Sequence, residues 1–376
     1  MRLVVAATLL FGSGFAALVY QTVWQRQFCL IFGASTGASA AVLGIFLGGL
    51  GIGAAWLGRR AERSAHPLQF YGNLEVIVAL CAALTPLLAQ GAAHAYYALG
   101  GSRALGPFGA TLVRLVLAAL VMGPATVAMG GTLPAMARAV ETANDDSRER
   151  LAVLYAINTL GAVAGSLMGT FVLFEVMGYR FTLWTACSIN LLVAIAARSL
   201  GRQQVPLDTT ATTPHAATTD DAAQAVLPDR RVIYAVAALV GFCFLLLEMI
   251  WYRMLSPLLG GTTFTFGLIL AVALAGIGLG GYAYARRARH TPVTLYTLAT
   301  TLGLEAFFAA VPVLLGDHVA LLAAHTRQLQ SIGFHGLVES WLLIAMLVVF
   351  PTALVSGYQF PVIFALLGRG RSGVAE

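Results

Sequence analysis

The residues with the greatest chemical potential in this sequence are acids that lie inside long apolar segments. Glu305, Glu248 and Glu75 each stand in such a segment. A carboxylate inside a bilayer costs several kcal/mol unless a cation, a hydrogen-bond donor or water compensates it. Glu305 therefore indicates either a cation or proton site or a buried structural hydrogen bond. Glu75 lies nearer the start of its segment, which favours a side chain that reaches the polar interface.

Glu248 has two aromatic neighbours at helical spacing. Trp251 and Tyr252 follow it by three and four residues, so all three side chains share one helix face. An acid beside aromatic rings can bind an organic cation through charge and through cation–π attraction. Gln21 and Trp24 have the same spacing in an earlier segment. The alternative is that both tryptophans belong to the aromatic belt at the membrane surface.

Two segments that contain glycine and proline, Gly130–Pro134 and Gly357–Pro361, interrupt long apolar runs. Proline removes an intrahelical hydrogen bond, and broken helices at matched positions of two halves indicate a transport pathway. The freed carbonyl groups would then be satisfied by ligand, by water, or by polar neighbours such as Tyr358 and Gln359. Simple kinks without transport are the alternative.

The composition defines the class of protein in which these residues act. The chain has 376 residues, of which 59% are hydrophobic and 10% charged, and its mean hydropathy is +0.83. Soluble domains are about a quarter charged, so most aqueous enzymes are excluded. The net charge of +6 comes from arginines in short loops, which is typical of a membrane protein and predicts no nucleic-acid partner.

The apolar runs predict an all-α integral membrane protein with about ten transmembrane helices, six in the first half and four in the second. The first run is interpreted as a retained span and not as a signal peptide, because it belongs to an internal repeat. The predicted spans cover residues 3–24, 35–57, 70–90, 111–136, 151–175, 181–199, 231–252, 263–285, 294–315 and 338–366.

The two halves are related in sequence. Gly14–Arg63 aligns with Gly241–His290 without a gap, with 15 identities in 50 positions. Pro124, Gly130 and Pro134 recur at the same constant offset. Because six is an even number, both halves enter the membrane from the same side, which predicts two parallel repeats with a major-facilitator-like architecture.

We divide the chain into a first membrane repeat at 1–202, a cytoplasmic linker at 203–229 and a second membrane repeat at 230–376. With both termini in the cytoplasm, most arginines fall in cytoplasmic loops. We therefore expect a multi-pass protein in the lipid bilayer of the bacterial cytoplasmic (inner) membrane. The second repeat has no counterpart of the last two spans of the first, so the chain is either a genuine ten-span form or a cut coding unit.

No cofactor or metal ion is expected. The four cysteines lack the spacing of zinc, iron–sulfur or haem sites. Gly276–Gly281 formally contains a dinucleotide-binding pattern, but it lies inside a predicted span, and together with Gly49–Gly53 it predicts close helix contacts. Tyr155, Asn158 and Asn190 are interpreted as polar packing residues.

Four sequence stretches carry a family resemblance: SGFAALVYQTVWQR, VGFCFLLLEMIWYR, MGGTLPAMAR and LYAINTLGAVAGS. The chain resembles, from Gly14 to Leu366, the membrane part of bacterial proteins in which a major-facilitator-like region is fused to a spermidine synthase-like domain. The resemblance implies that aminopropyl transfer belongs to a separate Rossmann-type domain that binds decarboxylated S-adenosylmethionine. Only ten residues follow Leu366, so we expect no enzyme activity from this chain. The acid typical of the family is present as Glu248 and is replaced by Gln21 in the first copy.

Two functions are consistent with these observations. In the first, the chain is a transporter-like protein that binds or moves a small organic cation such as a polyamine, with Glu305 and Glu248 balancing its charge. In the second, it is a non-transporting membrane scaffold that anchors a partner protein. The flank left open by the missing two spans would then hold that partner.

Overall fold

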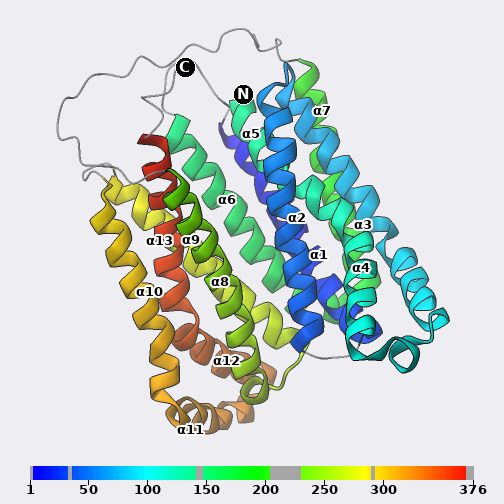
Figure 1. Ribbon diagram of the computed structural model, residues 1–376, viewed down its shortest axis with the longest axis vertical. Helices are drawn as coiled ribbons and strands as arrows, with labels where there is room; N and C mark the ends of the chain where they lie inside the picture. The colour runs from blue at the N-terminus through cyan, green and yellow to red at the C-terminus, as the bar shows by residue number, and fades with distance from the viewer. Residues whose placement is uncertain (1–2, 33–35, 141–146, 204–229, 289–292, 370–376) are drawn as a thin grey trace. The chain divides into compact units, whose positions relative to one another are not determined.

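The computed structural model describes residues 3–32, 36–140, 147–203, 230–288 and 293–369 (Figure 1). Within these ranges the ordered elements are helices and no strand occurs, which confirms the predicted all-α class. Nine helical stretches of the described chain are long and apolar enough to cross a membrane. The protein is therefore a multi-pass α-helical membrane protein.

Within the described residues, the first part of the chain forms seven α-helices along its apolar runs. A single π-helical turn, η1, separates α6 from α7. The elements are α1 (Leu3–Phe32), α2 (Thr36–Glu62), α3 (Pro67–Ala98), α4 (Gly101–Gly130), α5 (Thr132–Val140), α6 (Ser147–Met168), η1 (Gly169–Leu173) and α7 (Phe174–Arg202).

The described residues of the second part form six α-helices and one 3-10 turn, η2. Thr294 caps the start of α10, where its hydroxyl oxygen accepts a hydrogen bond from the backbone N–H of Thr297. The elements are α8 (Arg230–Leu259), α9 (Thr263–Ala288), α10 (Leu295–Leu315), α11 (Asp317–Thr326), η2 (Arg327–Ile332), α12 (Phe334–Val348) and α13 (Phe350–Arg369).

The chain divides into two compact units. The first unit comprises residues 1–209 and 262–271, and the second comprises residues 210–261 and 272–376. In the first unit, α1 packs against α6, α7 and α2, and α3 packs against α4 and α7. In the second unit, α13 packs against α10, α12 and α8. Most of the predicted linker, residues 204–229, lies outside the described residues.

Two predicted spans are joined in one helical stretch, Val153–Arg202. Gly178 lies between them with φ 70° and ψ 172°, a conformation that glycine adopts readily because it has no Cβ. Two segments of membrane-crossing length therefore remain within this stretch, as the sequence predicts.

The predicted span 338–366 is wrong as a single helix. It is divided at Val349 into the 15-residue α12 and the 20-residue α13. Pro351 is the second residue of α13. Proline is well tolerated there, because the first N–H groups of a helix have no intrahelical partner in any case. The same residue stops α12 from continuing.

Close glycine contacts join α2 to α4 in the first unit. A Cβ on Gly53 would lie 2.0 Å from the carbonyl oxygen of Val127, and one on Gly130 would lie 2.2 Å from that of Leu50. Real Cβ atoms do not approach oxygen so closely, so only glycine permits this helix spacing.

The second unit contains the same contacts at the equivalent positions of the repeat. A Cβ on Gly280 would lie 2.0 Å from the carbonyl oxygen of Leu354, and one on Gly357 would lie 2.2 Å from that of Ile277. Each of the four positions is the counterpart of one in the first unit. The predicted role of Gly276–Gly281 as a helix contact is confirmed, and the internal repeat extends to three-dimensional packing.

The predicted break at Gly357–Pro361 is wrong, because α13 runs through both residues without interruption. Pro361 removes one hydrogen bond but leaves the remaining ladder of the helix intact. At Gly130–Pro134 the chain behaves differently: α4 ends at Gly130 and α5 begins at Thr132. The two matched segments thus share a glycine contact and not a matched break.

Candidate functional site

The acid of the first unit, Glu75, has both carboxyl oxygens occupied. The Ser13 hydroxyl donates to its Oε1 at 2.6 Å, and the Asn190 side-chain amide donates to its Oε2 at 2.7 Å. The Glu75 side chain is fully buried, so the prediction that it reaches the membrane interface is wrong. Its hydrogen-bond donors come from α1 and α7, and their approach from both sides keeps the carboxyl group inside the unit.

Tyr71 extends the contacts of this acid. It lies one turn before Glu75 on α3, and its hydroxyl donates to the carbonyl oxygen of Leu9 on α1 at 3.3 Å. The group of Glu75, Ser13, Asn190 and Tyr71 therefore ties three helices together through buried hydrogen bonds. We interpret it as structural, because its carboxyl group needs no further ligand.

Trp24 lies in the core of the first unit. Its ring is fully buried, it stacks on Tyr20 with the ring centroids 5.6 Å apart, and its indole N–H donates to the Thr85 hydroxyl at 3.1 Å. Gln21, one turn earlier, is also buried. Trp24 is therefore not part of an aromatic belt, since its ring and its N–H are both satisfied by protein.

Glu248 and Trp251 are buried in the same way on α8. Their exposed fractions are 5% and 2%, and the Trp251 ring meets the edge of Phe244 at a centroid distance of 5.9 Å. Tyr252 is half-buried. The belt interpretation is thus wrong for Trp251 as well. Oε1 of Glu248 has no hydrogen-bond partner among the described residues, in contrast to the oxygens of Glu75.

Glu305 is the central residue of α10, a helix of 21 residues. It is 7% exposed, and Ser356 and Gln359 of α13 lie within interaction range of its carboxyl group. Gln359 is fully buried. Within the described chain, Oε1 of Glu305 has no hydrogen-bond partner, and neither amide atom of Gln359 has one. The structure thus brings together two of the predicted site residues, and each keeps at least one polar atom without a hydrogen-bond partner.

The other candidates are distributed differently. Gln21 and Trp24 belong to the first unit, while Glu248, Trp251 and Tyr252 lie on α8 of the second. The Tyr358 ring packs edge-on against Tyr284 of α9 at 5.5 Å. The second unit therefore contains two distinct acid-centred groups, one on α8 and one between α10 and α13.

The sequence reasoning missed two residues beside Glu305. Thr352 and Ser356 precede Gln359 by seven and three residues on α13, which places all three side chains on one helix face. This polar spacing in an otherwise apolar segment is the signal that could have identified them. Among the partners of Glu75, Ser13 and Tyr71 carried no comparable signal.

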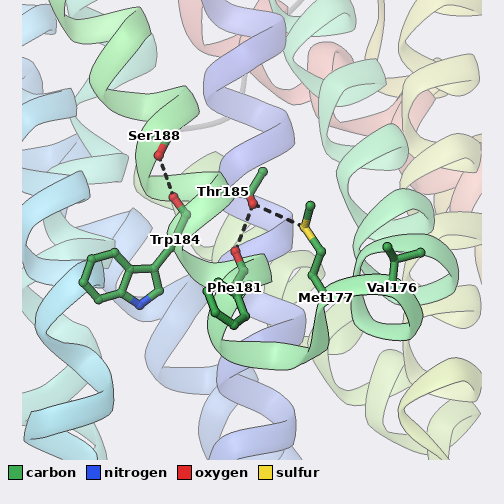
Figure 2. A pocket seen from close by; sticks show the side chains of 6 residues that line it. All are labelled: Val176, Met177, Phe181, Trp184, Thr185 and Ser188. Carbon is green, nitrogen blue, oxygen red and sulfur yellow. Dashed lines mark hydrogen bonds between the residues drawn. The ribbon is translucent and has the colours of Figure 1, made fainter.

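A surface hollow of about 530 Å³ lies on α7 beside the Gly178 bend (Figure 2). Its polar groups are already bonded within the helix: the Thr185 hydroxyl donates to the carbonyl of Phe181, and the Ser188 hydroxyl donates to that of Trp184, each at 2.9 Å. The hollow therefore offers mainly apolar surface and is not a candidate cation site. It is lined by Val176, Met177, Phe181, Trp184, Thr185 and Ser188.

No protein family model and no curated protein matches the chain. Among solved structures, the chain is similar to an auto-inhibited POT family peptide transporter, with 13% sequence identity, coverage of 97% of this chain and 88% of that one, and a TM-score of 0.35. The fold and the site together define a multi-pass helical membrane protein with buried acids in its second unit.

Proposed function

We propose that this protein transports a small organic cation across the membrane, and that its two parallel repeats form a major-facilitator-like carrier. The observation that carries the proposal is the contrast among the three buried acids. Glu75 is fully hydrogen-bonded, whereas Glu248 and Glu305 each keep one carboxyl oxygen without a partner in the described part of the chain. Buried charges need a compensating group, and a cationic substrate supplies one.

The group on α8 supports an organic substrate. Glu248 provides a negative charge, and Trp251 and Tyr252 lie three and four residues further on the same helix face. Aromatic faces attract ammonium and guanidinium groups, so this combination favours an organic cation over a neutral solute. A polyamine is the substrate that the sequence resemblance suggests, and Glu305 would contribute the second negative charge of the pathway.

Catalysis does not form part of this proposal. Aminopropyl transfer would belong to a separate Rossmann-type domain, as the sequence resemblance implies. We place the carrier in the bacterial inner membrane with both termini in the cytoplasm, as the arginine distribution favours.

Uptake of labelled spermidine into proteoliposomes tests the proposal. We expect the unsubstituted protein to accumulate label, and Glu248→Gln and Glu305→Gln each to lower uptake about tenfold or more. A tenfold change corresponds to about 1.4 kcal/mol, and loss of one buried charge from a cation site costs at least that much. The same assay with putrescine, choline and an uncharged sugar defines the substrate class.

Glu339→Gln provides the matched control, because Glu339 is an exposed acid of the same unit. It should retain full uptake. Unchanged uptake in Glu305→Gln would remove that residue from the pathway. Absence of uptake of every cation by folded, reconstituted protein would contradict transport and favour the membrane-scaffold function.

A further inference from the structure

A stripe of polar side chains runs between α10 and α13. It consists of Glu305, Thr352, Ser356 and Gln359, which we call the polar stripe. On α13 its members span about 10 Å along the helix, from a rise of about 1.5 Å per residue. Beyond Gln359 the helix continues into a buried apolar cluster that includes Val362.

Four atoms of the polar stripe lack a hydrogen-bond partner among described residues: Oε1 of Glu305, Oγ1 of Thr352 and both amide atoms of Gln359. Thr352 and Gln359 are 0% exposed. Threonines in helices usually bond back to the preceding turn. The hydroxyls of Thr126 and Thr301 do so, donating to carbonyl oxygens at 3.2 and 2.8 Å. The Thr352 hydroxyl does not, as is also true of Thr170 in the first unit, and it is available for another ligand.

Packing does not require these polar groups. At the constant sequence offset of the internal repeat, Thr352 corresponds to Ala125 and Ser356 corresponds to Met129. Both residues of the first unit are buried and apolar. The equivalent helix of the first repeat is thus buried without polar groups at these positions. Gln359 corresponds to Thr132, which is also polar and buried. Unsatisfied buried polar atoms destabilise a protein, so the polar residues that the second repeat has at the other two positions point to a ligand.

The ligand atoms that the polar stripe can offer are oxygens. They belong to a carboxylate, two hydroxyls and an amide carbonyl, while the amide N–H group of Gln359 can donate to the Glu305 carboxylate. Oxygen ligands favour hard cations over transition metals. One carboxylate balances one positive charge, and a divalent ion would leave an excess charge at the centre of a membrane helix.

We infer that the polar stripe between α10 and α13 is a binding site for a partly dehydrated inorganic monovalent cation, for which sodium is the test ion. The bound ion would contact the free oxygens of Glu305 and Gln359, and water would link it to the Thr352 hydroxyl, about 10 Å away along α13. If the protein is a transporter, this ion couples uptake of the organic cation to the sodium gradient. Only that coupling rests on the proposed function; ion binding itself does not.

Thermal unfolding of the purified full chain tests ion binding without any substrate. Tm is measured in the chlorides of sodium, lithium, potassium and N-methylglucamine at constant ionic strength. We expect sodium to raise Tm saturably relative to N-methylglucamine, because a ligand that binds only the folded state stabilises it. Thr352→Val and Gln359→Leu should each abolish the sodium-dependent rise. Both variants exchange a buried polar group for an apolar one of similar size, so they should fold even where Glu305→Gln does not.

Thr301→Val is the matched control, since the Thr301 hydroxyl is buried one turn from Glu305 but is already bonded to Leu298. It should keep the sodium response. Equal Tm in all four salts overturns the inference, as does a sodium response that survives in both Thr352→Val and Gln359→Leu. Stabilisation by spermidine but not by sodium also overturns it. A sodium response in protein that transports nothing would contradict only the proposed function.

Discussion

At the scale of single residues, three buried acids of one chain have different surroundings. Glu75 accepts hydrogen bonds from a serine 62 residues away and an asparagine 115 residues away. Glu248 and Glu305 each retain an oxygen without a partner within the described ranges. A satisfied buried carboxyl group stabilises its helices, whereas an unsatisfied one costs free energy unless a ligand is bound. The three residues therefore have different roles despite similar burial.

Substitution of Glu75 should destabilise the protein without involving a ligand. In Glu75→Ala the Ser13 hydroxyl and the Asn190 amide lose their acceptor, and each buried polar group left unsatisfied costs about 1–3 kcal/mol. Tm in detergent should fall in Glu75→Ala and in Asn190→Ala, and the double variant should lose less than the sum. Glu175→Ala removes an exposed acid of α7 and should leave Tm unchanged. Additive losses would show that the two residues do not interact.

At the scale of elements, each unit is built around a helix pair held together by glycine. Gly53 and Gly130 bring α2 and α4 into backbone contact, and Gly280 and Gly357 do the same for α9 and α13. These contacts determine where α13 lies and thus position the polar stripe. Pro361 does not interrupt that helix, so Ser356 and Gln359 stay on one continuous face opposite α10.

Alanine at the contact glycines should separate these helices. We expect Gly53→Ala and Gly280→Ala to lower Tm, because each new Cβ would overlap a carbonyl oxygen of the facing helix. Gly51 and Gly303 are the matched controls, since nothing lies within 4 Å of a Cβ placed there. Alanine at these two positions should raise stability by about 0.5–1 kcal/mol, as expected for glycine replaced within a helix. Equal effects at contact and control positions would contradict the close packing.

At the scale of the whole molecule, the chain consists of two units. They share the glycine contacts between helices, but they differ in their other helices and in their buried polar residues. The first unit contains α6 and α7 in addition to the helices of the repeat, and α7 provides the Asn190 that satisfies Glu75. The second unit contains both acids that lack a partner in the described chain. We therefore expect the first repeat to act mainly as a support and the second to contain the ligand sites.

Cysteine labelling in sealed vesicles tests the parallel orientation of the two repeats. The four native cysteines are first replaced, and single cysteines are then introduced at exposed positions. His66→Cys and Thr294→Cys, which precede the third helix of each repeat, should react from the same side of the membrane. Ser102→Cys and His318→Cys, beyond the ends of those helices, should react from the opposite side. Labelling of His66→Cys and Thr294→Cys from opposite sides would show an inverted repeat.

The helical class, the number of membrane-length segments and the internal repeat could be predicted from the sequence. They depend on properties that are read along the chain: hydropathy over some twenty residues and identity at a constant offset. The position of Glu305 in an apolar segment belongs to this group. The sequence did not predict the division of the last span at Val349 or the continuity of α13 through Pro361. Tertiary packing determines whether a proline ends a helix or is accommodated in it.

Only the tertiary structure decided which buried acid is satisfied. The same residue type in the same kind of apolar helix is bonded at Glu75 and left open at Glu305, because the partners come from other helices far away in the chain. Hydropathy indicates that a side chain leaves water, but it does not show which group it then meets. For the same reason Trp24 and Trp251 could be assigned to the membrane surface from the sequence, although both are buried inside the protein.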